Sequence, residues 1–147
     1  MRVYLDVCCF NRPFDDQSQE RIRLEAEAVL LILQRVWTED WQLISSDVVI
    51  DEIDQTPNPH RRKRLRQYLM YVDEAIRVNG SIRNRAQDIM DAGVTIEDAL
   101  HIACAEYANV DVFLTTDDRL LRRGANTLPP LQCKIDNPLQ WILEQQK

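Results

Sequence analysis

The chain has 147 residues and a formal net charge of −6 at neutral pH, with 45% hydrophobic and 29% charged residues. These values are ordinary for a globular protein, so we expect one domain that spans residues 1–147. No stretch approaches the roughly 20 apolar residues of a membrane span. The N-terminal residues lack the pattern of a signal peptide, so a cytoplasmic protein without membrane association is expected. The negative charge argues mildly against nucleic acid as a partner, but carboxylates gathered around a metal ion would account for part of it.

The cysteines form no C-x-x-C pair, which leaves a zinc ribbon or a thioredoxin-type redox motif unsupported. They are Cys8, Cys9, Cys104 and Cys133. Adjacent cysteines rarely pair, so we predict reduced, mostly buried side chains that act as small apolar residues.

The N-terminal half alternates short apolar runs with segments whose apolar residues recur at helical spacing. The predicted elements are a strand over 2–5, a turn-rich loop over 11–16, a helix over 19–37, a strand over 41–45 and a short helix through Ile53. Ser18 is placed to cap the first helix, and Ser45 or Ser46 to cap the second. Pro57 and Pro59 end the second helix.

The C-terminal half continues this alternation. Its predicted elements are a helix over 60–75, a short strand over 76–78, a helix over 81–92, a helix that begins after Thr95, a strand over 110–114, a short helix over 119–123, a strand over 133–135 and a helical turn over 138–146. The helix after Thr95 is almost wholly apolar and is therefore expected to be buried. We expect Trp37, Trp41 and Trp141 to pack in the core or at an interface.

Strands that alternate with helices predict an α/β fold with a central parallel sheet of about four to five strands, flanked by helices. In such sheets, ligands bind beyond the carboxyl ends of the strands. Asp6 and Asp117 fall at predicted strand ends, while Glu52 and Asp98 lie near the starts of helices. The same rim of the sheet is therefore expected to gather all four carboxylates.

Several carboxylates on one rim are suited to hold a hard divalent cation such as Mg²⁺, which prefers oxygen ligands. Such an ion can activate water and stabilise charge on a phosphate, and phosphodiester hydrolysis requires both. Other phosphate chemistries fit less well. The chain has only three glycines and no glycine-rich phosphate loop, and Asp6-Val7-Cys8 lacks the second acid of a haloacid-dehalogenase phosphatase.

Four segments resemble, in order, the acidic motifs of the PIN domain, a family that includes the VapC-type toxins of bacterial toxin–antitoxin pairs. They are Tyr4-Leu5-Asp6, Ser46-Asp47-Val48-Val49-Ile50-Asp51-Glu52-Ile53, Glu97-Asp98-Ala99-Leu100-His101-Ile102-Ala103-Cys104-Ala105 and Phe113-Leu114-Thr115-Thr116-Asp117. The resemblance covers nearly the whole chain and implies a PIN-like fold. It further implies an endoribonuclease that uses Mg²⁺ or Mn²⁺ to cut RNA, forms a homodimer and is blocked by a small antitoxin.

Carried over residue by residue, the resemblance implies four catalytic carboxylates that bind metal, namely Asp6, Glu52, Asp98 and Asp117. Thr115 corresponds to the family's Ser or Thr beside the last acid, whose hydroxyl could bind a ligating carboxylate or water, and Asp118 could replace Asp117. Asp51 is a weaker competitor for Glu52, because neighbouring helical positions point about 100° apart.

Basic residues directly follow the last acidic motif, where they are placed to contact the backbone of a substrate. They are Arg119, Arg122 and Arg123. A second basic run, over 61–66, could also contact phosphates. An exposed helix face balanced by Asp73 and Glu74 explains that run at least as well.

Several of these residues have a structural alternative. Thr95 and Asp98 have the spacing of a capping box, and one of Asp117 and Asp118 could cap the helix that follows. His101 lies on roughly the same helix face as Asp98. A buried, hydrogen-bonded histidine is favoured there over a zinc ligand, because no other residues complete a zinc site. The alternative function is a PIN-like module that binds RNA or protein without cutting, although retention of all four acids argues against it.

Overall fold

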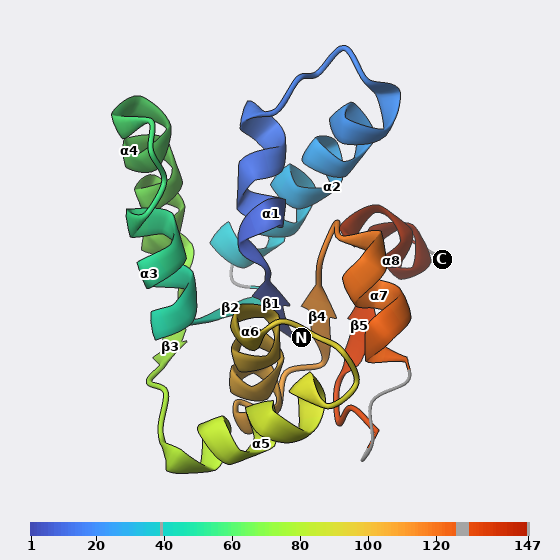
Figure 1. Ribbon diagram of the computed structural model, residues 1–147. Coiled ribbons are helices and arrows are strands. Elements are labelled where there is room, and N and C mark those ends of the chain that lie inside the picture. Colours follow the sequence, from blue (N-terminus) through green and yellow to red (C-terminus); the bar gives the residue numbers. More distant parts are fainter. Residues whose placement is uncertain (39, 126–129, 147) are drawn as a thin grey trace.

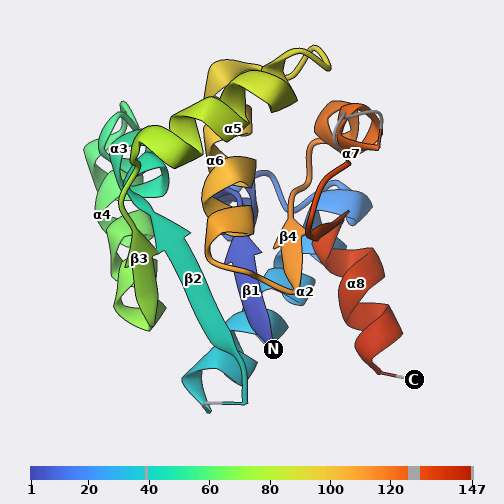
Figure 2. The ribbon, with the colours of Figure 1, turned by 90° about the horizontal axis from the view of Figure 1, so that it is seen from below.

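A computed structural model describes residues 1–38, 40–125 and 130–146 and confirms the predicted α/β fold with a parallel sheet (Figure 1). The strands are β1 (Arg2–Leu5), β2 (Gln42–Ser46), β3 (Glu74–Ile76), β4 (Val112–Leu114) and β5 (Lys134–Asp136). They pair in the order β3-β2-β1-β4-β5, and every pair is parallel (Figure 2). The carboxyl ends of β1 and β4 therefore lie side by side at the middle of one edge.

The helices are α1 (Val7–Asn11), α2 (Glu20–Trp37), α3 (Asp47–Asp54), α4 (Pro59–Tyr68), α5 (Gly80–Met90), α6 (Ile96–Tyr107), α7 (Asp118–Gly124) and α8 (Pro138–Gln145). Helices α5 and α6 pack against each other on one face of the sheet, and α2 packs against α8 on the other (Figure 2). Within the described residues, none of these helices is long and apolar enough to cross a membrane.

The sheet is buried most deeply at its centre. The β4 residues are buried throughout, and so are the last three residues of β1, whereas the edge strands β3 and β5 are largely exposed or half-buried. Strands covered on both faces are expected to be continuously apolar, as Val-Phe-Leu of β4 is. Tyr4 of β1 stacks on Phe113 of β4, with ring centroids 5.3 Å apart. This packing fixes the two strand ends that carry the first and last acidic motifs.

Several predicted elements have different limits in the structure. The expected loop over 11–16 is partly helical, because α1 ends at Asn11 and a 3₁₀ turn, η1 (Arg12–Phe14), follows it. The predicted Ser18 cap is wrong, since α2 begins at Glu20 and no side chain caps it.

Two elements in the middle of the chain also have boundaries that differ from the prediction. Strand β3 begins two residues before the predicted 76–78 segment. The helix predicted over 60–75 ends at Tyr68 and continues as a second 3₁₀ turn, η2 (Leu69–Tyr71).

The tryptophans divide into two groups. Trp41 and Trp141 are buried against each other, with ring centroids 5.0 Å apart. Trp37 does not lie in the core, because 72% of it is exposed beside Tyr71.

The cysteines are as predicted. All four are free, two of them buried and two half-buried.

Candidate metal centre

Asp6 occupies the point where β1 ends and α1 begins. Its backbone N–H donates to the Leu114 carbonyl of β4 (2.9 Å), and its Oδ1 caps α1 by accepting from the Val7 N–H (2.8 Å). The other carboxylate oxygen, Oδ2, accepts from the Thr115 hydroxyl at 2.9 Å. Only 6% of Asp6 is exposed. Burial raises its pKa, although the nearby His101 and the Thr115 hydrogen bond oppose the rise.

Glu52 reaches the same point from α3. That helix begins after Ser46, whose hydroxyl accepts from the Val49 N–H and caps it. The helix then directs Glu52 inward, with 33% of its side chain exposed, while the neighbouring Asp51 is exposed. The expectation that one of the two adjacent acids faces inward is therefore met by Glu52.

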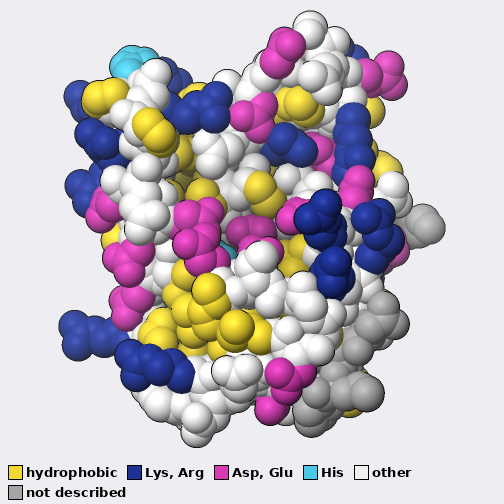
Figure 3. Space-filling view, in the orientation of Figure 1, with side chains coloured by type: hydrophobic (Ala, Val, Ile, Leu, Met, Phe, Trp, Pro, Cys, Tyr) yellow, Lys and Arg dark blue, Asp and Glu magenta, His cyan; other side chains and the backbone are white. Residues whose placement is uncertain are grey.

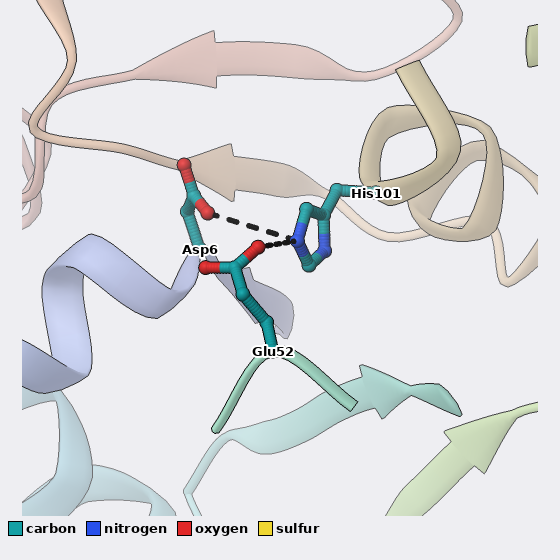
Figure 4. A group of neighbouring side chains, drawn as sticks. All are labelled: Asp6, Glu52 and His101. Carbon is teal, nitrogen blue, oxygen red and sulfur yellow. Dashed lines mark hydrogen bonds and ion pairs between the residues drawn. The ribbon is translucent and has the colours of Figure 1, made fainter. Parts of the chain in front are cut away.

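His101 of α6 faces both carboxylates with one ring nitrogen (Figure 4). Its Nε2 is 3.1 Å from Glu52 Oε1 and 4.0 Å from Asp6 Oδ1. One donor atom from each of the three residues falls within 4.8 Å of the other two. Burial lowers the pKa of the imidazole, but the hydrogen bond to Glu52 and the negative charges of Asp6, Glu52 and Asp98 outweigh it and raise the pKa overall.

The other ring nitrogen of His101 faces a buried chain of hydroxyl groups. Nδ1 is 2.8 Å from the Tyr4 hydroxyl, which is 2.6 Å from the Ser46 hydroxyl. All three residues are completely buried. The histidine is thus a buried, hydrogen-bonded residue, as predicted, and it also faces the carboxylates.

Asp98 lies in the first turn of α6, outside the tight group formed by Asp6, Glu52 and His101. Its N–H donates to the Thr95 hydroxyl at 3.3 Å, so Thr95 caps the helix as predicted. Burial and the negative charges of Asp6 and Asp117 raise the pKa of Asp98 to about 6. The side chain therefore shares one electrostatic environment with the first and last acids.

Asp117 and Asp118 have different partners. Asp117 caps α7, and Oδ1 accepts from the N–H groups of Arg119 (2.9 Å) and Leu120 (3.3 Å). Both bonds use Oδ1, so capping does not occupy Oδ2. Asp118 instead forms two hydrogen bonds with the Arg21 guanidinium, at 2.7 and 2.8 Å. This ion pair joins α7 to α2 and makes Asp118 the poorer replacement for Asp117.

Basic residues border the centre on one side. Arg119, Arg122 and Arg123 are exposed on α7. Figure 3 shows basic side chains over α7, next to acidic side chains at the middle of this face of the molecule. Arg123 also has a structural contact, because its guanidinium packs over Gly93 in the space that a side chain at position 93 would fill.

The basic run over 61–66 has mainly structural contacts. Arg61 donates to Asn11 and Asp15 and to the Phe14 carbonyl, and Arg66 donates to Asp54. The interpretation of this run as a structural helix face is therefore favoured over phosphate binding. Its acidic partners are not the predicted ones, because Asp73 accepts from the Leu43 N–H and Glu74 pairs with Arg2.

The family model of the PIN domain matches residues 3–126. This chain belongs to the PIN domain family. A search of curated protein sequences gave no significant match.

Solved structures share the PIN fold at low sequence identity. VapBC2 from Rickettsia felis, bound to a DNA fragment from its promoter, has a TM-score of 0.59 at 12% identity and covers 93% of this chain and 98% of its own. VapBC-1 from nontypeable Haemophilus influenzae has a TM-score of 0.57 at 12% identity, covering 94% and 98%. A protein from Pyrobaculum aerophilum has a TM-score of 0.55 at 14% identity, covering 99% and 88%.

The sequence alone missed part of this PIN-domain centre. It did not predict that His101 would contact Glu52, or that Tyr4 and Cys8 would line the site. The Cys8 thiol lies 3.4 Å from Asp6 Oδ2 and 3.3 Å from the Thr115 hydroxyl. The D-x-x-H spacing of Asp98 and His101 was the available signal, but spacing cannot show which element a helix faces.

Proposed function

We propose that this PIN domain is an endoribonuclease that depends on Mg²⁺ or Mn²⁺ and acts in the cytoplasm as the toxin-like member of a toxin–antitoxin pair. One observation carries the proposal. The carboxylates of Asp6 and Glu52, which are 46 positions apart in the sequence numbering, converge beyond the carboxyl ends of the strands. In open parallel sheets, this is the edge at which ligands bind.

The residues present suit a divalent cation. Asp6 and Glu52 supply the oxygen ligands that Mg²⁺ and Mn²⁺ prefer. Burial raises the pKa of both Asp6 and Asp98, and nearby negative charges add to the rise, from Glu52 for the first and from Asp6 and Asp117 for the second. A cation between them would reverse that local field and allow every carboxylate to stay ionised. In this proposal Asp98 and Asp117 complete the metal centre.

A bound divalent cation supplies activation of water and neutralisation of charge on the phosphate. The chain itself supplies position. Thr115 holds Asp6 Oδ2, the cap to Val7 holds Oδ1, and α3 directs Glu52 to the same point. In this proposal Arg119, with Arg122 as a second contact, holds a phosphate of the RNA backbone at the basic border of the site. Arg123 contributes less, because it also packs over Gly93.

The proposed partners are a small antitoxin and a second copy of the chain. VapBC2 and VapBC-1 have the same fold, and they support the antitoxin by analogy. An exposed apolar surface is available for such contacts. Trp37 is 72% exposed and Met70 86% exposed, and both line a cavity with Tyr68 and Tyr71. Apolar side chains that gather on a surface often mark a protein interface.

The decisive test is cleavage of labelled single-stranded RNA by protein stripped of metal, with and without added Mn²⁺. We expect cleavage only with the ion, and loss of cleavage in Glu52→Gln. The matched control is Asp51→Asn, which removes an exposed acid from the adjacent position of the same helix. Cleavage that survives the combined loss of Asp6 and Asp98 would overturn the proposal. RNA binding without cleavage under all conditions would favour the non-cutting alternative.

A further inference from the structure

The acidic centre contains a nitrogen atom that could bind a metal ion, although a site for Mg²⁺ alone does not require one. His101 is completely buried, and Nε2 points at the two carboxylates rather than at apolar side chains (Figure 4). A buried imidazole needs partners for both ring nitrogens, but one hydrogen bond to each would be enough. The placement of Nε2 against both Asp6 and Glu52 calls for a further explanation.

The two distances from His101 Nε2 to the carboxylates are close to the spacing of ligand atoms around one ion. Octahedral bonds of about 2.1 Å place adjacent ligand atoms about 3.0 Å apart and opposite ones about 4.2 Å apart. Nε2 of His101 lies 3.1 Å from Glu52 Oε1, close to the adjacent value, and 4.0 Å from Asp6 Oδ1, close to the opposite value. One ligand atom from each of the three residues falls within 4.8 Å of the other two, so the group is compact enough to surround one ion.

The far side of the imidazole is built as a metal-binding histidine requires. A ligating histidine usually donates its second ring N–H to a fixed acceptor, which sets the tautomer and the ring orientation. With its proton on Nδ1, His101 donates to the Tyr4 hydroxyl at 2.8 Å, and Tyr4 donates onward to Ser46 at 2.6 Å. When an ion replaces the proton that Nε2 shares with Glu52, this tautomer leaves the Nε2 lone pair free to bind the ion.

We propose that His101 Nε2 is a direct ligand of the divalent ion, beside Asp6 and Glu52, and that it makes the centre prefer first-row transition ions over Mg²⁺. The proposal rests on the metal-dependent function proposed above. Imidazole nitrogen binds transition ions better than it binds Mg²⁺, for which oxygen ligands are favoured. The protein should accordingly bind Mn²⁺ more tightly than Mg²⁺, and Co²⁺ more tightly than Mn²⁺, following the general affinity order of these ions.

The direct test is pulsed electron paramagnetic resonance of the intact protein loaded with Mn²⁺ and carrying no histidine tag. We expect nitrogen hyperfine coupling to the ion, and a shift of that coupling to the ¹⁵N pattern when only histidine is labelled with ¹⁵N. The other histidine of the chain is exposed at position 60, so His60→Gln is the matched control and should leave the coupling unchanged. No variant of the buried His101 is needed for this measurement.

Calorimetry supplies a second readout. In His101→Asn, Mn²⁺ affinity should fall by at least about 10-fold, since the loss of even a supporting group costs a metal site that much. Mg²⁺ affinity should fall less, because Mg²⁺ favours oxygen ligands, so the ratio of Mn²⁺ to Mg²⁺ affinity should decrease. Bound Mn²⁺ without nitrogen coupling would overturn the histidine ligand but leave the proposed nuclease intact. No binding of Mn²⁺ by the parent protein would overturn both proposals. An unchanged affinity ratio in a folded His101→Asn protein would overturn the selectivity claim.

Discussion

Replacement of Asp98 by asparagine should change stability in opposite directions without and with metal. The pKa of Asp98 rises from 3.8 to about 6 in the folded chain, because of burial and the charges of Asp6 and Asp117. A carboxyl group whose pKa is higher in the folded chain than in the unfolded chain stabilises the fold while it is protonated. For Asp98 this stabilisation is fully present below pH ~4 and is lost as the pH rises through about 6. At pH 7.5 the ionised side chain therefore destabilises the metal-free protein.

The size of the effect follows from the same shift. At about 1.4 kcal/mol for each pKa unit, the ceiling is roughly 3 kcal/mol, and solvent screening of a half-buried group reduces it to about 1–2 kcal/mol. The substitution also removes a negative charge that favours the helix dipole in the first turn of α6, which reduces this gain in stability by roughly 0.3–1 kcal/mol. Asp98→Asn should thus raise the metal-free melting temperature at pH 7.5 by about 2–4 °C, the change that ~1 kcal/mol gives in a chain of this size.

With Mn²⁺ added, the parent protein should be more stable than Asp98→Asn. A Mn²⁺ concentration of 100 times the dissociation constant should add about 2.7 kcal/mol to the free energy of unfolding of the parent. The variant should gain much less, because a metal-site carboxylate is lost. The assay is thermal unfolding with chelator and with Mn²⁺. The control is Glu97→Gln, which removes an exposed acid from the same helical turn. A variant that is less stable without metal, yet gains the parent's full stabilisation from Mn²⁺, would show that Asp98 serves the helix and not the ion.

Three other predictions concern the site and the surface. Mn²⁺ affinity, followed by calorimetry from pH 8 to 5, should fall as the pH drops through about 6, where Asp98 takes up a proton, and an affinity that is flat across this range would contradict its role. Thr115→Val should lower the free energy of unfolding at neutral pH by about 1.5–3 kcal/mol, because the buried Asp6 carboxylate loses a hydrogen bond. Chemical denaturation checks this against Thr116→Val, a control at a second buried threonine, which should lower the free energy of unfolding less. Light scattering should give twice the chain mass of 17.3 kDa for the parent and the single mass for Trp37→Glu. Leu143→Glu, at an exposed residue of α8, should stay dimeric, and a parent that is already monomeric would refute the proposed dimer.

The elements that sequence predicted best have strong periodic or capping signals. Helix α6 was identifiable from its apolar body and from Thr95, because a hydroxyl three residues before an acid is a frequent helix start. Strand β1 was identifiable because Val3, Tyr4 and Leu5 form an apolar run that ends at a polar residue.

Other features depended on contacts that no local pattern contains. Helix α1 was missed because turn-forming residues follow it and because Asp6, interpreted as a ligand, also caps it. Four acids were assigned from motif order, but only three-dimensional packing shows that Asp6 and Glu52 meet closely while Asp98 and Asp117 stand further out. The burial of His101 was predicted, whereas its contact with Glu52 depends on how α3 packs against α6.

The central claim is that Asp6 and Glu52 together hold a divalent ion, and crystals soaked in Mn²⁺ test it most directly. Anomalous scattering locates the ion independently of any assay with RNA. We predict a peak within about 2.0–2.3 Å of one carboxylate oxygen from each residue, the range of metal–oxygen bonds. A saturating soak that leaves this position empty, or that places Mn²⁺ only elsewhere on the surface, would contradict the account.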